Sequence, residues 1–344
     1  MRTFDAAVIG AGTFGAWTAW HLRKAGLSVA LIDAYGTGNS RSSSGGESRV
    51  IRMGYGADEI YTLWALRSLE AWRELSARVD PPLFLRTGVL WMGRAEDPYM
   101  EATLAALHRA GVPNESLERN ELEKRLPQIA LGPIEWGVLE PESGALLARR
   151  AVRAVAAEAA ALGAERLDAM VEPPSGLGRL ESIALSPGGQ LSAGAFVFAC
   201  GAWMGRILPD LLGERIFPTR QEVFYFGPAA GDARFRPPAM PAWLDLTEKW
   251  YGIPDLETRG FKLAPDIHGP RFDPDTEERA VTAEGIAAAR EYLARRVPLL
   301  KDAPLLSSEV CQYENTSSGD FLIDRHPGFE NVWLAGGGSG HGFK

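Results

Sequence analysis

The sequence predicts an α/β domain of the Rossmann type, in a chain long enough to hold a second domain. A short apolar strand runs directly into the glycine motif GAGTFG, and a second apolar strand ends in an acidic residue. The chain has 344 residues, of which 46% are hydrophobic, so it can bury one large core or two moderate ones. Two domains are therefore the better expectation.

The first of these elements is a strand at residues 5–9, followed at once by a helix. Gly10, Gly12 and Gly15 stand in the G-x-G-x-x-G register. In this register the first glycine allows a tight turn, the second lets the backbone approach a pyrophosphate, and the third lets the helix pack close to the strand. We expect the helix to end near Lys24, with Gly26 as its stop signal.

The second strand is expected at residues 28–32 and is followed by Asp33. A carboxylate at this place can accept hydrogen bonds from a ribose hydroxyl. Strand, helix, strand and acid in this order predict dinucleotide binding, against the alternative of a purely structural glycine turn. The residues themselves leave open whether the nucleotide is NAD or FAD.

The next segment, TGNSRSSSGGESRVIR, combines serines, glycines and arginines. Such a segment offers hydroxyls, backbone amides and positive charges near the cofactor end of the first strands. The alternative is a flexible surface loop. We favour a cofactor loop, because Arg49 and Arg52 are followed by an aromatic helical pattern and not by further linker.

Composition excludes several other classes of protein. A formal net charge of -8 and a sequence pI near 5.3 argue against nucleic acid as a partner. No apolar run is long enough to cross a bilayer, and the first residues lack a signal-peptide pattern, so we expect a cytoplasmic protein without a membrane partner. Cys200 and Cys311 are far apart and show no metal-ligand spacing, so we expect neither a disulfide nor a metal site.

Four motifs carry a resemblance to a known family. GAGTFG, the SSSGGESRVIR loop, CQYENT around Cys311 and the final GGGSGHGFK occur in family order and span the chain from its first strand to its last residue. The sequence resembles the monomeric sarcosine oxidase and N-methyltryptophan oxidase group, which are FAD-dependent amine oxidases of the D-amino-acid oxidase superfamily. This resemblance selects FAD over NAD.

The resemblance implies an α/β plus α+β architecture, the glutathione reductase-like FAD fold, in which a Rossmann-type FAD-binding domain is interleaved with an antiparallel-sheet substrate domain. The FAD-binding domain would comprise residues 1–86, 143–214 and 312–344, and the substrate domain residues 87–142 and 215–311. Local patterns predict a helix at 151–162, a strand at 167–171, a hairpin turn at SPGGQ and a buried strand at 195–199.

For the cofactor, the resemblance implies FAD bound covalently through the sulfur of Cys311. Without the family, a lone cysteine in a strand is a small buried hydrophobic residue, and Cys200 keeps that interpretation. The residues that the resemblance and the nucleotide motif together assign to the cofactor are Gly10, Gly12, Thr13, Phe14, Gly15, Asp33, Ser42, Ser43, Ser44, Arg49, Val171, Gly201, Trp203, Cys311, Gly337, Gly338, Gly340, His341, Gly342 and Lys344.

For the substrate, the resemblance implies that Arg52 and Lys344 hold a carboxylate. The alternatives are that Arg52 pairs with Glu47 or Glu59, and that Lys344 is only the last residue of this sequence. Tyr313 and Tyr251 match family positions that line the substrate pocket.

Three further residues are assigned to catalysis by the resemblance: Lys262, Arg49 and His341. Lys262 matches a lysine that activates oxygen, where a buried cation stabilises developing negative charge. Its alternative is a solvated residue at a sheet edge. Arg49 and His341 would lie beside the flavin, although a lone histidine is more often a polar side chain with its hydrogen bonds satisfied.

The resemblance implies a monomer that oxidises a small secondary amino acid such as sarcosine with molecular oxygen, giving an imine that hydrolyses to amine and aldehyde, and hydrogen peroxide. One alternative is an FAD-dependent dehydrogenase that passes electrons to another acceptor; another is a non-catalytic flavin-binding protein. The second alternative arises because family members continue beyond HGFK with a helix that supports negative charge on the flavin, whereas this sequence ends at Lys344.

Overall fold

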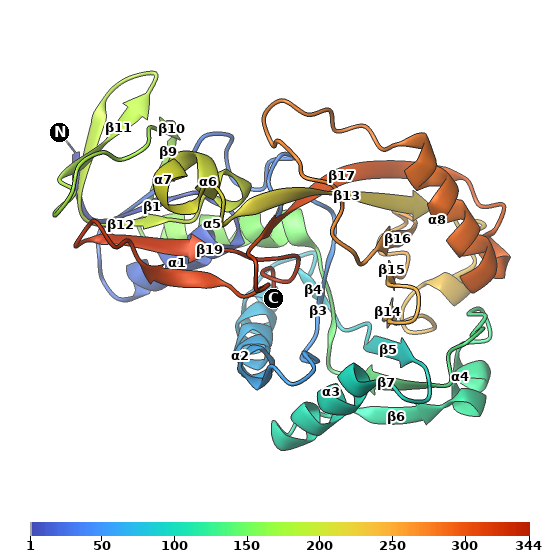
Figure 1. Cartoon of the computed structure of the whole chain (residues 1–344). Coiled ribbons are helices and arrows are strands. Elements are labelled where there is room, and N and C mark those ends of the chain that lie inside the picture. The colour runs from blue at the N-terminus through green and yellow to red at the C-terminus, as the bar shows by residue number, and fades with distance from the viewer. Residues whose placement is uncertain (1) are drawn as a thin grey trace.

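The computed structural model describes residues 2–344, and in this range it contains two eight-stranded sheets and one three-stranded sheet (Figure 1). The first sheet has the order β10-β11-β12-β1-β2-β9, and β19 joins it by pairing with both β12 and β18. Its strands are β1 (Arg2–Ile9), β2 (Val29–Asp33), β9 (Glu165–Asp168), β10 (Met170–Val171), β11 (Ser182–Ser186), β12 (Gln190–Phe198), β18 (Leu322–Arg325) and β19 (Val332–Gly336).

The centre of this sheet is parallel, because β1 pairs in parallel with β2 and β12, β2 with β9, and β12 with β19. Strands β1 and β2 flank α1 (Thr13–Lys24) in sequence, which is the predicted βαβ unit. α1 contacts α5 (Ala148–Ala161), and both helices bury alanines that permit a close approach. The Rossmann-type prediction is confirmed.

The second sheet is mainly antiparallel, with the order β17-β13-β16-β15-β14-β5-β7-β6, and only β14 and β5 pair in parallel within it. This confirms the predicted antiparallel-sheet component. Its strands are β5 (Val89–Gly93), β6 (Glu115–Glu118), β7 (Trp136–Glu140), β13 (Phe217–Phe226), β14 (Ala242–Asp245), β15 (Trp250–Ile253), β16 (Phe261–Pro265) and β17 (Leu305–Asn315).

A small sheet of β3 (Arg49–Ile51), β8 (Gly144–Leu146) and β4 (Phe84–Leu85) belongs to neither large sheet. The remaining helices are α2 (Glu59–Ser76), α3 (Pro98–Arg109), α4 (Arg119–Arg125), α6 (Met204–Ile207), α7 (Pro209–Leu212) and α8 (Ala283–Arg296), with 3₁₀ turns η1 (Gly201–Trp203), η2 (Ala233–Phe235) and η3 (Pro298–Leu300). In Figure 1, β13 and β17 extend from the second sheet toward the first, so the two sheets meet along these strands.

Most local predictions agree with the structure, with one correction. The predicted helix at 151–162 is α5, and the SPGGQ turn joins the antiparallel strands β11 and β12. The single strand predicted at 167–171 is wrong: β9 pairs with β2, whereas β10 pairs with β11. The chain changes partner at Ala169, whose amide donates to the carbonyl of Asp33. The domain boundaries stay a prediction.

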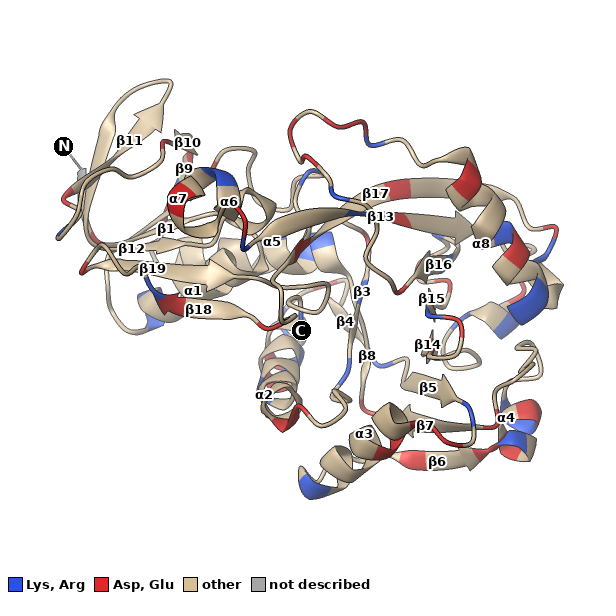
Figure 2. Cartoon of the chain, in the orientation of Figure 1, with Lys and Arg blue, Asp and Glu red and all other residues tan. Residues whose placement is uncertain are grey.

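Charged residues avoid the central strands. Figure 2 shows acidic and basic residues side by side along α4 and α8 and in the loops, while β12 and β19 carry neither. Among residues 2–344, no helix combines the length and the hydropathy needed to span a membrane.

Candidate functional site

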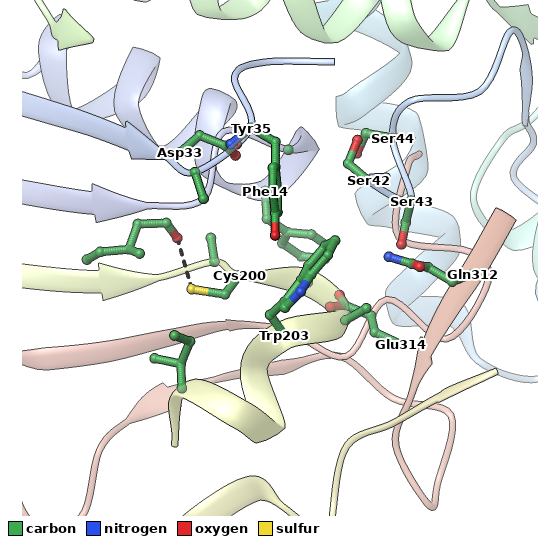
Figure 3. Close-up of a pocket in the computed structure, with 18 of the residues that line it drawn as sticks. Phe14, Asp33, Tyr35, Ser42, Ser43, Ser44, Cys200, Trp203, Gln312 and Glu314 are labelled. Atoms are coloured by element: carbon green, nitrogen blue, oxygen red, sulfur yellow. Dashed lines mark hydrogen bonds between the residues drawn. The ribbon is translucent and has the colours of Figure 1, made fainter. Parts of the chain in front are cut away.

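A cavity of about 380 Å³ opens at the carboxyl ends of β1, β2 and β12 (Figure 3). Ligands of open α/β sheets bind at this edge. Strand β17 of the second sheet forms the opposite wall, so the cavity lies at the junction of the two large sheets. The predicted residues that line it are Gly10, Gly12, Thr13, Phe14, Asp33, Ser42, Ser43, Ser44, Arg49, Val171, Gly201, Trp203, Cys311, Tyr313, Gly338, Gly340 and Gly342.

The glycine turn has different spatial constraints at each position. Gly10 has a φ of +100°, and a Cβ there would overlap the carbonyl oxygen of Ala199. A Cβ at Gly15 would overlap the carbonyl oxygen of Gly10, so this glycine allows α1 to pack against the turn. By contrast, a Cβ at Gly12 would have only the Ser44 hydroxyl near it, at 3.4 Å. The fold therefore requires Gly10 and Gly15, and leaves space in front of Gly12.

Asp33 is the last residue of β2 and lines the cavity there. Its Oδ2 accepts from the amide of Ala11 at 2.7 Å, and its Oδ1 accepts from the amide of Tyr35 at 2.9 Å. Burial raises the pKa of Asp33 above its ordinary value, although these backbone amides oppose the shift. The carboxylate is thus fixed next to the glycine turn, where a ribose would lie in the predicted mode of binding.

The serine-rich segment lies against the cavity and is not a solvated loop. Ser44 Oγ accepts from the amide of Thr13 at 3.1 Å, which ties the segment to the first turn of α1. Arg49 donates to the carbonyl oxygens of Ser43 at 2.5 Å and Ser48 at 2.8 Å. These bonds hold the segment between α1 and β17.

Cys311 lies on β17 and faces this segment. Its Sγ is 3.1 Å from Nη2 of Arg49 and 3.8 Å from the carbonyl oxygen of Ser43. The thiol is partly exposed and lines the cavity, so a ligand in the cavity can reach it.

Lys262 lies on β16, between β13 and β15, with only 2% of its surface exposed. The alternative of a solvated edge lysine is therefore wrong. Its Nζ donates to the carbonyl oxygen of Ser48 at 2.9 Å, so it adjoins the Arg49 segment. Burial, together with the neighbouring guanidinium of Arg49, lowers the pKa of Lys262 to about 7.

Arg52 and Lys344 approach each other around one aromatic ring. The Arg52 guanidinium carbon lies 4.6 Å from the ring centre of Tyr55 and 4.5 Å from that of Trp91, and Lys344 Nζ lies 5.3 Å from Tyr55. Among the described residues, no carboxylate forms an ion pair with either cation. Both side chains are half-buried, and burial together with the Arg52 guanidinium lowers the pKa of Lys344 well below its ordinary value. A carboxylate bound between Arg52 and Lys344 would favour the charged form of Lys344.

The alternative ion pairs of Arg52 do not form. Glu47 pairs with Arg149 and Arg259, and Glu59 pairs with Arg109. Arg52 instead donates to the carbonyl oxygen of Gly54.

Glu140, which the sequence did not reveal, supports this arrangement. It is fully buried and accepts from the amides of Met53 and Gly54 at 2.7 and 3.0 Å, and from Nε1 of Trp91 at 2.7 Å. It thereby fixes both the backbone that follows Arg52 and the ring on which Arg52 stacks. No local signal could identify Glu140, because its partners are far away in the sequence.

His341 lies among aromatic rings next to the cations. Its Nε2 is 3.0 Å from the carbonyl oxygen of Gly319, and its Nδ1 is buried without a partner among the described residues. Burial and the adjacent Lys344 lower the pKa of His341 to about 4, so the ring is neutral near pH 7.

Tyr251 lies beside Lys262, whose Nζ is 5.7 Å from the tyrosine ring centre, and Tyr313 lines the cavity. Burial raises the pKa of both phenols, so both keep their protons near neutral pH. Seven of the predicted residues do not line the cavity: Gly15, Arg52, Tyr251, Lys262, Gly337, His341 and Lys344. Their functional roles stay predictions.

Several residues that line the cavity were not predicted. Glu314 and Gln312 belong to the quoted CQYENT motif, yet neither was assigned a role. Alternation along β17 sets them on the face opposite Cys311 and Tyr313, so this pattern gave no signal for them. Asp275 reaches the cavity from a loop before α8, and accepts from Nε1 of Trp203 at 2.8 Å and from Arg206. No local pattern indicated that this loop crosses to the first sheet.

The residues around the cavity fit FAD. The space in front of Gly12 at the start of α1 suits a diphosphate, and the first turn of α1, described in full, carries no acidic residue. Two polar atoms at the cavity, Ser43 Oγ and Glu314 Oε2, are buried without partners among the described residues and can bond to a polar ligand. No cluster of His, Cys, Asp or Glu within residues 2–344 could hold a metal ion.

Comparison with protein families and curated proteins agrees with this geometry. The family model described as FAD dependent oxidoreductase (DAO) matches residues 5–344. Monomeric sarcosine oxidase of Bacillus sp. (strain B-0618) is 32% identical, with 99% of this chain and 88% of that protein covered. Peroxisomal sarcosine oxidase of Mus musculus is also 32% identical, with the same coverage of both chains. N-methyl-L-tryptophan oxidase of Salmonella heidelberg (strain SL476) is 28% identical over 99% of this chain and 91% of that protein.

Solved structures share the fold. L-proline dehydrogenase from P. horikoshii superposes with a TM-score of 0.84 at 22% identity, covering 99% of this chain and 90% of that chain. Glycine oxidase from Geobacillus kaustophilus gives a TM-score of 0.80 at 20% identity, covering 100% and 92%.

Proposed function

The chain belongs to the family of FAD-dependent oxidoreductases, and from this membership we propose that it oxidises a small secondary amino acid, sarcosine or a close relative, at the C–H bond next to nitrogen. The observation that carries the substrate class is the pair of basic side chains around Tyr55, Arg52 and Lys344, neither of which has an ion-pair partner among the described residues. The guanidinium of Arg52 offers a planar pair of donors and the amine of Lys344 a single point donor, and both can donate to the same carboxylate. The names of the sarcosine and N-methyl-L-tryptophan oxidases among the relatives support an N-methyl amino acid.

In this proposal, FAD supplies the two-electron oxidant when it is bound. Arg52 and Lys344 hold the substrate carboxylate, while Glu140 keeps Trp91 and the backbone after Arg52 in place. The amine binds with its nitrogen unprotonated, so no general base is needed. The product imine hydrolyses in water to an amine and an aldehyde.

Lys262 and Arg49 act on the cofactor side of the site. Lys262 is a buried cation below its pKa of about 7 and stabilises negative charge that develops on oxygen during its reduction to hydrogen peroxide. Arg49 contacts both Cys311 and the serine-rich segment, so it joins the two walls of the cavity.

We also propose that Cys311 links covalently to the flavin and that the protein works as a monomer. The exposure of Cys311 to the cavity and the Arg49 contact support the first statement, and similarity to enzymes named monomeric sarcosine oxidase supports the second.

The decisive experiment is an absorbance spectrum of the purified protein during anaerobic addition of sarcosine and then air. We expect loss of the yellow colour with sarcosine and rapid recovery with release of peroxide. Slow recovery in air would favour a dehydrogenase, and an unchanged spectrum with sarcosine and related amino acids would contradict the proposal.

Acid precipitation tests the covalent link. The colour should stay with the precipitated protein, and it should pass into the supernatant for Cys311→Ser. Colour in the supernatant of the unchanged protein would remove Cys311 from the site without affecting the proposed oxidation.

A further inference from the structure

Glu314 is a buried acid at the cavity with one oxygen unused. The side chain is 6% exposed, and its Oε1 accepts from the amide of Gly338 at 3.0 Å. Its Oε2 is buried and has no hydrogen-bond partner among the described residues. The residue lines the cavity, and Figure 3 shows its carboxyl group directed toward Trp203. A buried polar atom beside an open cavity indicates a partner that the ligand supplies.

Three glycines surround the carboxyl group, so no side chain at these positions stands between it and the cavity. A Cβ on Gly201 would lie 3.4 Å from Oε2, and Cβ atoms on Gly336 and Gly338 would lie 3.5 and 3.3 Å from Oε1. The ring of Phe14, in the first turn of α1, adjoins Gly338. Glu314 therefore lies where the turn after β12, the turn after β19 and the start of α1 converge.

No positive charge compensates this acid. The titratable side chains on the elements packed around it are Cys200 at the end of β12, Cys311 and Tyr313 on β17, Arg220 on β13 and His341 after β19, and among the described residues none of them bonds to its carboxyl. Arg220 is engaged with Glu222 instead. Burial raises the pKa of Glu314 to about 7, although the amides of Gly338 and Gly337 oppose the shift.

We propose that Glu314 is a cofactor-binding residue which, as a neutral carboxylic acid, donates a hydrogen bond from Oε2 to the ribityl–diphosphate chain of FAD. This rests on FAD binding as set out above. The position follows from the two ends of the cavity: Asp33 marks the ribose end and Cys311 the flavin end, while Glu314 adjoins Phe14 and Gly338. Hydroxyls and diphosphate oxygens are the acceptors that the connecting chain offers, and a diphosphate anion further favours the protonated acid.

In this proposal the Glu314 carboxyl group is protonated in the FAD complex. FAD binding therefore takes up one proton when Glu314 is ionised in the free protein, and none when it is already protonated. Below pH 7 the acid is already protonated in the free protein and affinity is constant. Above pH 7 the free protein loses this proton, so affinity falls by up to about tenfold per pH unit. FAD itself does not change charge between about pH 6 and 9, because its diphosphate is fully ionised there.

The test measures the dissociation constant of FAD by quenching of flavin fluorescence between about pH 6 and 9. The full-length chain carries Cys311→Ser, so that binding is reversible. In this background we compare the parent protein, Glu314→Gln, Glu314→Leu and, as a control, Glu330→Gln, which removes an exposed carboxylate.

The expected results separate the two protonation states. Glu314→Gln can accept from Gly338 and donate into the cavity, so it should bind FAD tightly and lose the part of the pH dependence that belongs to Glu314. Lys262, whose pKa is about 7, is present in all four proteins and contributes equally to each. Glu314→Leu should bind about tenfold or more weakly, because the donor is lost and the Gly338 amide is left without its acceptor. The parent and Glu330→Gln should both lose affinity above pH 7.

The opposite pattern overturns the proposal. If Glu314→Gln binds FAD weakly and the affinity of the parent protein rises with pH, Glu314 acts as an ionised carboxylate that accepts a hydrogen bond. Equal affinity with the same pH profile in all four proteins would show that Glu314 does not contact FAD. Failure of every protein, the parent included, to bind FAD would refute the cofactor assignment itself. If Glu314→Leu does not fold, the pH profiles of FAD affinity for the parent protein and Glu314→Gln are enough to decide between these outcomes.

Discussion

At the scale of single residues, the structure holds two separate pairs of basic side chains, and we propose that one pair serves the substrate and the other the cofactor. Arg52 and Lys344 gather around Tyr55, whereas Arg49 and Lys262 gather around the Ser43–Ser48 segment, through bonds to its carbonyl oxygens. The charges of Arg49 and Lys262 repel each other. Burial lowers the pKa of Lys262, and this repulsion lowers it further. The separation permits independent tests of the two pairs.

Lys262→Met should slow the reaction of reduced protein with oxygen by about 100-fold or more, while reduction by substrate changes little, because the preorganised charge acts on developing negative charge. In the unchanged protein the ammonium loses its proton above a pKa of about 7, so the reoxidation rate should fall as the pH rises through about 7. Stopped-flow mixing of anaerobically reduced protein with oxygen measures both effects.

Lys301→Met, which alters an exposed lysine, is the matched control and should reoxidise normally. A Lys262→Met protein with unchanged reoxidation would exclude this lysine from the oxygen reaction and would favour the dehydrogenase alternative.

Arg52→Gln should raise KM for sarcosine by about 10- to 100-fold, the range expected for loss of a charged hydrogen bond. An amine without a carboxylate, such as dimethylamine, should be used equally poorly by both proteins. Initial rates of peroxide formation give this comparison, with the exposed Arg67→Gln as control. If Arg52→Gln discriminates between the two amines as well as the unchanged protein does, the carboxylate lies elsewhere.

At the scale of elements, the glycine turn before α1 meets two requirements at different residues. Gly15 allows α1 to pack against the turn, and Gly12 leaves space for a ligand. Gly15→Ala should destabilise the apoprotein by about 1–3 kcal/mol, because the new Cβ overlaps the carbonyl of Gly10 and forces α1 away from the turn. Gly12→Ala should destabilise the apoprotein by no more than about 1 kcal/mol, because its Cβ meets only the Ser44 hydroxyl and the main cost is that alanine is a poor N-cap residue for α1. Yet Gly12→Ala should bind FAD far more weakly.

Urea unfolding of the two apoproteins and titration with FAD measure these effects. The prediction fails if Gly12→Ala binds FAD like the unchanged protein, because the space in front of Gly12 would then not hold the diphosphate.

The elements also show which parts of the fold could be predicted from the sequence. The βαβ unit, α5 and the SPGGQ hairpin follow from local patterns, since periodicity and turn residues act over short distances. The division of residues 167–171 between β9 and β10 does not, because it depends on which neighbours, β2 and β11, accept each half. Glu140 and Asp275 were missed for the same reason: their partners lie far away in the sequence.

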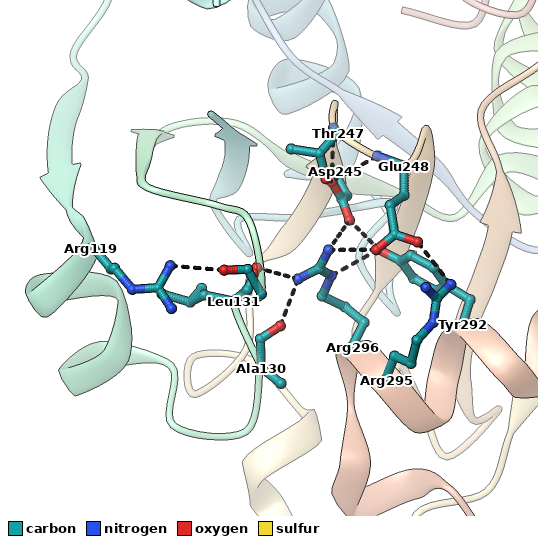
Figure 4. A network of polar contacts seen from close by, with 10 residues as sticks. Arg119, Ala130, Leu131, Asp245, Thr247, Glu248, Tyr292, Arg295 and Arg296 are labelled. Atoms are coloured by element: carbon teal, nitrogen blue, oxygen red, sulfur yellow. Dashed lines mark hydrogen bonds and ion pairs between the residues drawn. The ribbon is translucent and has the colours of Figure 1, made fainter. Parts of the chain in front are cut away.

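At the scale of the whole molecule, a buried polar network secures the second sheet far from the cavity (Figure 4). Arg296 on α8 donates to Asp245 Oδ2 at 2.7 Å, and Tyr292 donates to the same oxygen at 2.7 Å. The same guanidinium donates to the carbonyl oxygens of Ala130 and Leu131 at 2.6 Å. One side chain thus connects α8, the end of β14 and the loop before β7.

Arg296→Met should destabilise the protein by about 3–5 kcal/mol, because Asp245 would remain buried as an unpaired charge. Arg295→Met removes a neighbouring ion pair to Glu248 in which the arginine side chain is 55% exposed, and should cost less than about 1 kcal/mol. Urea unfolding followed by fluorescence compares both with the unchanged protein. Since the network lies outside the cavity lining, folded Arg296→Met should bind FAD with unchanged affinity. A loss of affinity in the folded variant would show that the second sheet transmits its packing to the cofactor site through β13 and β17, the strands that join it to the first.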